Sequence, residues 1–280
     1  MSSRCHICVD PACGGKGGCN CETCTRKATC HRYGGLKPTI RITRKCTQAC
    51  SHCCFDCDTE ATEMMSPETA VKINQFCQAN EITRCEIMGG EFFVNPEWEP
   101  VLESLCQGMK NVRLVSNGDW AGNTKVATRV ISFLKSHPEV HVGISRDRWH
   151  TNKQVDAACA LLTEAGINHR TPTAEEVKPE SIVPVGRSQY DCSNMFAMFG
   201  TYCFQNEKRY NFLIDEEGRI YKCSFGTWQY DTIQDYLKGG FAPRFKEFNT
   251  KFYGVFISNC SSCQRMEGQA KREGKSCCKK

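Results

Sequence analysis

The sequence predicts an α/β fold, a partial (β/α)6 TIM-like barrel with a cysteine-rich N-terminal segment and a small C-terminal module. Between residues 38 and 187, short β-branched runs alternate with helical segments of about 10–15 residues, a pattern typical of parallel sheets with right-handed crossovers. Cysteine is unusually abundant, with 23 in 280 residues. Beyond about residue 190 the alternation stops, which indicates a second module.

The elements of the barrel follow from local signals taken in chain order. The β-branched alternation from Pro38 to Thr43 predicts a strand, and Ser66-Pro67-Glu68 combines a cap, a first-turn proline and a favourable acid, which predicts a helix to about Ala79. The same reasoning predicts strands over 84–88, 112–116, 140–145 and 182–185, and helices over 97–109, 124–136 and 153–165. In such folds the active site lies at the C-terminal ends of the strands.

We expect three regions along the chain. Residues 1–34 carry seven cysteines without apolar periodicity, so this segment needs metal or the main body in order to fold. Residues 35–190 form the barrel. Residues 191–280 form the smaller module, in which 211–215 and 219–222 predict a hairpin that ends next to Cys223.

Composition excludes several classes of protein. No window approaches the ~18 apolar residues of a membrane span, and the first residues lack an apolar signal core. We therefore expect a cytoplasmic protein with no membrane partner, whose reduced cysteines serve as metal or cluster ligands. The net charge of +5 is not evidence for nucleic acid, because thiolate-bound clusters add negative charge and no basic stripe is present.

Residues suited to a cluster and a polar cofactor follow each of the first four predicted strands. Three thiols within eight residues hold three irons of a [4Fe–4S] cube and leave the fourth iron open. Paired glycines let a ligand approach the backbone. In chain order, these strand ends carry Cys46-x-x-x-Cys50-x-x-Cys53, Gly89-Gly90-Glu91, Ser116-Asn117-Gly118 and Ser145-Arg146-Asp147.

These motifs, in this order and spacing, resemble those of the radical S-adenosylmethionine (radical SAM) enzymes, over about residues 38–187. One departure is His52, where the family usually has an aromatic residue before the third cysteine. The resemblance implies a SAM-binding [4Fe–4S] cluster on Cys46, Cys50 and Cys53. It also implies reductive cleavage of SAM to a 5′-deoxyadenosyl radical that removes a hydrogen from the substrate. The residues expected to bind SAM are Gly89, Gly90, Glu91, Ser116, Asn117, Ser145 and Arg187.

The cysteines at both ends predict further metal sites. The C-terminal module resembles the SPASM or Twitch extensions of this family, which implies one auxiliary [4Fe–4S] cluster on Cys203, Cys223, Cys260 and Cys263. In the N-terminal segment the spacing of Cys5, Cys8, Cys21 and Cys24 fits structural zinc. A zinc site would not use Cys13, Cys19 and Cys30, so a further iron–sulfur cluster is the alternative to zinc. We assign no role to Cys54, Cys57, Cys192, Cys277 and Cys278.

The substrate class is the least determined property. Relatives with such extensions often modify ribosomally made peptides by crosslinking, epimerisation or oxidation, and this is the function we expect. The alternatives are a dehydrogenase or rearrangement enzyme for a small metabolite, a tRNA-modifying enzyme, and a non-catalytic zinc or cluster module. The expected partners are a peptide or small-molecule substrate and an electron donor such as flavodoxin or ferredoxin. Candidate catalytic residues after the barrel strands are Asp119, Asp147 and His150.

Overall fold

A computed structural model describes residues 36–80, 82–147, 149–150, 153–171, 210–221 and 229–232. These residues form one eight-stranded sheet in the order β5-β4-β3-β2-β1-β6-β7-β8. The strands are β1 (Leu36–Arg41), β2 (Arg84–Met88), β3 (Asn111–Ser116), β4 (Val140–Ile144), β5 (His169–Arg170), β6 (Tyr210–Ile214), β7 (Arg219–Tyr221) and β8 (Gln229–Thr232). Strands β1 to β5 are parallel and lie in chain order, as the alternating pattern predicts.

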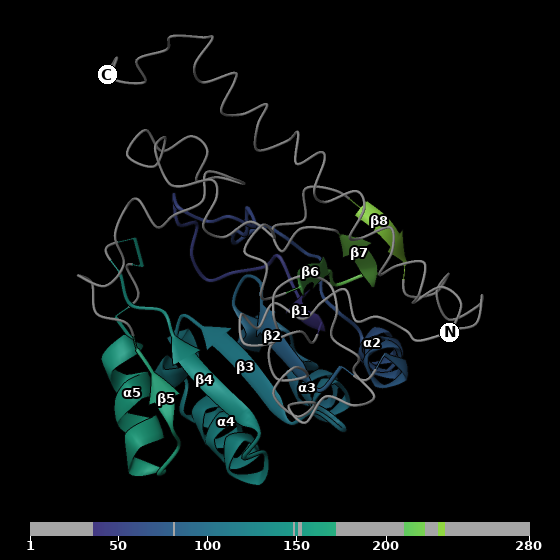
Figure 1. Cartoon of the computed structure of the whole chain (residues 1–280). Coiled ribbons are helices and arrows are strands. Elements are labelled where there is room, and N and C mark those ends of the chain that lie inside the picture. The colour runs from purple at the N-terminus through teal and green to yellow at the C-terminus, as the bar shows by residue number, and fades with distance from the viewer. Residues whose placement is uncertain are drawn as a thin grey trace, which may run out of the picture.

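A helix connects each of these parallel strands to the next. The helices are α2 (Pro67–Ala79), α3 (Trp98–Cys106), α4 (Thr124–Ser136) and α5 (Val155–Glu164), with 3-10 turns η2 (Phe92–Val94) and η3 (Asp119–Gly122) after β2 and β3. Figure 1 shows the helices ranged along the sheet, while β6, β7 and β8 continue it beyond β1. The α/β partial-barrel fold is therefore confirmed.

Local signals explain where the helices begin and end. The Ser66 hydroxyl accepts the Thr69 backbone N–H and starts α2, and the Asn123 side chain does the same for α4. Helix α3 ends three residues before the predicted Met109, because Gln107 leaves the helical conformation. The carbonyl of Gln107 then accepts a hydrogen bond from Asn74 of α2 at 2.7 Å, which ties the two helices together.

Two apolar clusters stabilise the structure. The larger one packs the strands against the helices, and its fully buried members include Ile40, Ile73, Phe76, Trp98, Leu102 and Phe212. The smaller one joins Phe55 and Cys57 of the segment after β1 to Leu213 of β6, with Met88 and Tyr221 packed against it. The expected hairpin is therefore packed directly beside the segment that carries the central cysteines.

Strand β6 pairs in parallel with β1 over five residue positions, and β7 turns back antiparallel to it. A buried ion pair reinforces this junction, because Arg41 at the end of β1 donates from Nε to the Glu216 carboxylate at 2.8 Å. Asp215 accepts hydrogen bonds from Arg219 at 2.7 Å and from the Tyr221 hydroxyl at 2.9 Å. The turn between β6 and β7 is thus fixed by charged groups.

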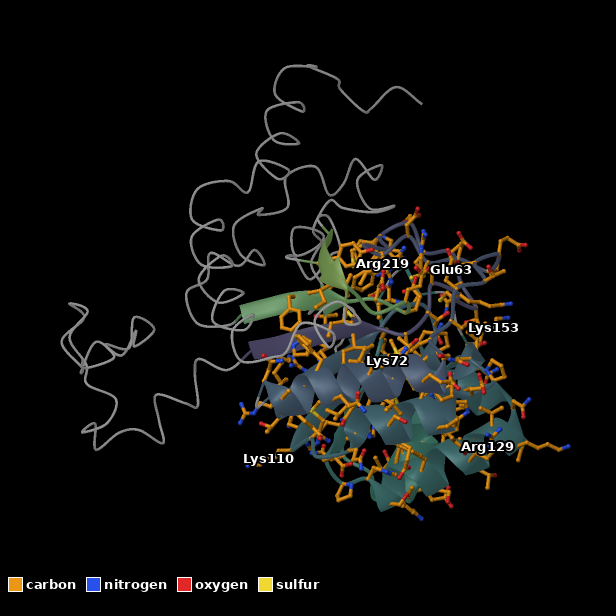
Figure 2. All side chains as sticks on the ribbon, turned by 90° about the vertical axis from the view of Figure 1, so that its right-hand side faces the viewer. Glu63, Lys72, Lys110, Arg129, Lys153 and Arg219 are labelled. Carbon is orange, nitrogen blue, oxygen red and sulfur yellow. The ribbon has the colours of Figure 1, made fainter. Side chains whose placement is uncertain are left out.

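Several predictions lie outside the described residues. They concern the strand at 182–185, the N-terminal segment 1–34 and most of the module 191–280. Within the described part of the chain, no helix is both long enough and apolar enough to span a membrane. In Figure 2 the labelled side chains of Lys110 and Arg129 lie at the lower edge of this body.

Candidate metal and cofactor site

The loop after β1 carries five cysteines and is closed at its base by backbone hydrogen bonds. The Cys46 N–H donates to the Asp58 carbonyl at 2.7 Å, and the Asp58 N–H donates to the Arg44 carbonyl at 3.2 Å. Inside the loop, the Cys53 N–H donates to the Cys50 carbonyl at 3.2 Å and forms a tight turn. We call residues 46–57 the cysteine loop. The hydrogen bonds at its base hold the two ends of the loop together.

A pocket at the C-terminal ends of the strands collects the strand-end motifs. Its lining includes all three thiols of the Cys-x-x-x-Cys-x-x-Cys motif, together with residues from the ends of β2, β3 and β4. These predicted site residues are Cys46, Cys50, Cys53, Gly89, Gly90, Ser116, Asn117, Ser145 and His150. Cys46 and Ser145, which are 99 positions apart in the chain, thus line one cavity, as expected for a parallel barrel.

The two glycines have a packing role that their sequence motif does not reveal. A Cβ on Gly90 would lie 1.9 Å from the Lys45 carbonyl oxygen, and one on Gly89 would lie 2.5 Å from that of Thr43. Gly89 also has a φ of +153°, which L side chains rarely adopt. The backbone that follows β2 therefore packs directly on residues 43–45, which lead into the cysteine loop, and the Gly90 N–H donates to the Thr43 carbonyl at 2.9 Å.

Glu91 lies behind the pocket wall, with a relative exposure of 1%. One carboxylate oxygen accepts the Ser116 hydroxyl and the other accepts the Asn117 backbone N–H, both at 2.8 Å. Burial raises the pKa of Glu91 to about 7, against the opposing effect of these hydrogen bonds. Glu91 does not line the pocket, so the contact that sequence analysis assigns to it with SAM stays a prediction.

Asn117 links the end of β3 to the cysteine loop. Its amide nitrogen donates to the Thr47 hydroxyl at 2.9 Å and lies 3.9 Å from the Cys46 sulfur. Burial raises the pKa of Cys46 to about 11, so that this thiol keeps its proton until a cation replaces it. Three sulfur donors in one partly buried pocket are the ligand set that iron–sulfur clusters require.

The predicted catalytic residues differ in their placement. His150 lines the pocket, whereas Asp119 and Asp147 do not. Asp147 lies behind His150 and accepts its Nδ1–H at 2.8 Å. Sequence analysis treated His52 as a minor departure and did not connect it to this pair, but its ring lies 4.9 Å from that of Trp149 in a stacked arrangement. The spacing Asp-x-x-His offered a signal for the pair, and nothing in the sequence indicated His52 as its neighbour.

Several predicted ligands lie outside the described residues. They are Arg187 for SAM, Cys203, Cys223, Cys260 and Cys263 for the auxiliary cluster, and Cys5, Cys8, Cys21 and Cys24 for the N-terminal site. Cys54 and Cys57 are described, and both line the same pocket as the three motif cysteines.

Comparison with known proteins finds chains that are similar in sequence. No family model matches the chain. The antilisterial bacteriocin subtilosin biosynthesis protein AlbA of Bacillus subtilis (strain 168) is 32% identical over 113 residues, which cover 40% of this chain and 24% of AlbA. YydG of the same organism, whose name refers to peptide biosynthesis, is 25% identical over 114 residues, or 40% of this chain and 36% of YydG. The matched part thus spans well under half of either relative.

Solved structures share the fold. The structure of anSMEcpe with bound AdoMet has a TM-score of 0.52 at 14% identity and covers 79% of this chain and 83% of that chain. BtrN in complex with AdoMet and 2-DOIA has a TM-score of 0.52 at 10% identity, with 78% and 87% covered. The chain is therefore similar in sequence to AlbA and YydG, and similar in fold to two proteins whose structures contain AdoMet. The motifs that resemble those of radical SAM enzymes lie at the strand ends of this shared fold.

Proposed function

We propose that this chain is an enzyme that binds a [4Fe–4S] cluster through Cys46, Cys50 and Cys53 and uses it to cleave SAM reductively. The observation that carries the proposal is the single pocket into which these cysteines and the ends of β2, β3 and β4 all open. When bound, the cluster supplies the electron that generates a 5′-deoxyadenosyl radical, which removes a hydrogen atom from the substrate. The protein's task is to hold SAM and to shield this radical from water.

The remaining residues of the site are proposed to bind or position SAM. Gly89 and Gly90 would present backbone to the amino group, and Ser116, Asn117 and Ser145 line the same pocket. Glu91 fixes that wall through its hydrogen bonds to Ser116 and Asn117. We further propose that Arg187, which follows the strand predicted over 182–185, pairs with the SAM carboxylate.

Electron paramagnetic resonance tests this assignment. Anaerobically reconstituted protein should show a reduced [4Fe–4S] signal that changes when SAM is added. The Cys50→Ala variant, measured beside it at equal iron loading, should lack the change. A signal that is insensitive to SAM in the wild type would contradict the proposal.

We propose a ribosomally made peptide as the substrate. AlbA and YydG are named for the biosynthesis of a bacteriocin and of a peptide, and a structure of anSMEcpe with AdoMet and the Cp18Cys peptide has a TM-score of 0.51 to this chain. The fold likeness to BtrN with 2-DOIA keeps a small metabolite as the second candidate. Incubation of candidate precursor peptides with the enzyme in D2O, followed by mass spectrometry, distinguishes the two, because crosslinking and oxidation change the peptide mass and epimerisation incorporates deuterium.

We also propose an auxiliary cluster in the C-terminal module. Cys223 follows the end of β7 by two residues, so β6 and β7 connect one proposed ligand to the barrel sheet. Cys203, Cys260 and Cys263 would complete the set, and Cys223→Ala should then lower the iron content by about one cluster. We propose that the N-terminal cysteines hold zinc or a further cluster, and that an electron donor such as flavodoxin or ferredoxin reduces the protein. We propose the cytoplasm as its location, because thiols stay reduced there.

A further inference from the structure

A chain of ring and charge contacts joins the cysteine loop to the segment after β4. His52 lies between Cys50 and Cys53, and its ring is 5.0 Å from that of His150, edge to face. Its Nε2 lies 3.8 Å from an Asp147 carboxylate oxygen. The same oxygen accepts the Nδ1–H of His150 at 2.8 Å. Asp147 therefore contacts both imidazoles from one position.

Asp147 is itself held rigidly. Its second carboxylate oxygen accepts the backbone N–H groups of Trp149 and His150 at 2.9 and 3.0 Å. Its side chain is only 8% exposed, and those of His52 and His150 are 17% and 15% exposed. Burial opposes ionisation of Asp147, but the hydrogen bond from His150 and the two nearby imidazoles outweigh it and lower its pKa. A fixed negative charge thus lies directly behind the cysteine loop.

We propose that Asp147 is a positioning residue for the cluster. It fixes His52, and with it the turn between Cys50 and Cys53, against the end of β4, and it adds a negative charge next to the cluster. This inference rests on the proposed function, because it requires a cluster on Cys46, Cys50 and Cys53. A charge in a partly buried site is weakly screened, so it influences the energy of adding an electron nearby.

The midpoint potential of the cluster tests the electrostatic part. Asp147→Asn keeps the shape of the side chain and removes its charge, so reduction becomes easier and the potential shifts upward. Asp147→Glu restores the charge and should bring the potential back toward the wild-type value. The matched control is Glu103→Gln, the corresponding change on a side chain of α3 that is 67% exposed, which should leave the potential unchanged.

The rate of iron release to a chelator tests the positioning part. His52→Phe keeps a ring that can stack on Trp149 but removes the nitrogen that faces Asp147. Under the proposal the cysteine loop becomes looser, and iron leaves the protein several-fold faster than from the wild type. This second variant provides a test that does not depend on whether Asp147→Asn folds.

The outcomes separate this inference from the proposed function. A wild-type chain that takes up no SAM-sensitive cluster would overturn both. Wild-type behaviour of Asp147→Asn in potential and of His52→Phe in iron release would overturn the inference alone. So would a divalent metal ion, additional to the cluster iron, that is lost in Asp147→Asn. The three side chains would then be metal ligands, since one ligand atom from each lies within 4.8 Å of the others.

Discussion

The carboxylate of Glu91 accepts a hydrogen bond from the Ser116 hydroxyl at 2.8 Å, and this contact joins the ends of β2 and β3 behind the pocket. Both residues are nearly inaccessible, with exposures of 1% and 2%. Ser116 in turn accepts the Gly118 N–H at 3.0 Å. The two motifs that we expect to bind SAM therefore form one hydrogen-bonded unit.

Glu91 should make the stability of the isolated chain depend on pH. Its pKa of about 7 lies above the ordinary 4.5, so between these values the folded protein keeps a proton that the unfolded chain has lost. Folding stability from this group is therefore fully present below about pH 4.5 and falls as the pH rises to about 7. At 1.36 kcal/mol per pH unit the total is roughly 3 kcal/mol.

Glu91→Gln isolates this contribution. We expect urea unfolding between pH 5 and pH 8 to show that the wild type loses stability relative to the variant as the pH rises. Parallel stability curves for the two proteins would show that Glu91 does not titrate in this range.

Substitution of Gly90 should disturb the contact between β2 and the cysteine loop. In Gly90→Ala the new methyl group would lie 1.9 Å from the Lys45 carbonyl, which is backbone and cannot rotate away. We expect a loss of unfolding free energy of about 3 kcal/mol, at the upper end for overpacking, and weaker retention of iron. The control is Gly166→Ala, where φ is +69° and no atom lies within 4 Å, so that only backbone strain of about 1 kcal/mol applies. Equal losses for the two variants would contradict this account.

Loss of the ion pair between Arg41 and Glu216 should strongly lower the free energy of unfolding. The two side chains are 10% and 1% exposed, so Arg41→Met leaves a buried carboxylate without its main partner. Removal of one member of a buried pair costs about 3–5 kcal/mol. Arg129→Met breaks an ion pair of the same 2.8 Å length at a side chain that is 50% exposed, and we expect little change in urea midpoint. A small effect of Arg41→Met would show that the hairpin is held mainly by its strand pairing.

The regular part of the fold could be predicted because its local signals agree with its packing. The predicted bounds of β2 and α4 are the observed ones: the Asn123 side chain caps the start of α4, and residues of β2 alternate between buried and more accessible positions. The two-residue strand β5 was missed because His169 and Arg170 are too few to show the alternation of apolar and polar residues that marks a strand. The pairing of β6 with β1 was also missed, because Phe212 and its neighbours carry no signal for which strand they join.

The site was predictable where chemistry depends on spacing and unpredictable where it depends on contacts in space. The spacing of Cys46, Cys50 and Cys53 is visible in the sequence, and the pocket contains all three. The burial of Glu91 and the contact of His52 with Asp147 arise from loops far apart in the chain. A linear pattern cannot report them.

Release of 5′-deoxyadenosine from SAM is the measurement that tests the central claim most directly. Reduced, anaerobically reconstituted protein should release it when candidate precursor peptides are added as substrates. Cys50→Ala should release none, since one of the three thiols needed for the cluster is missing. The absence of 5′-deoxyadenosine from wild-type protein shown to carry a full cluster, with those peptides present, would contradict the assignment of radical SAM chemistry to this pocket.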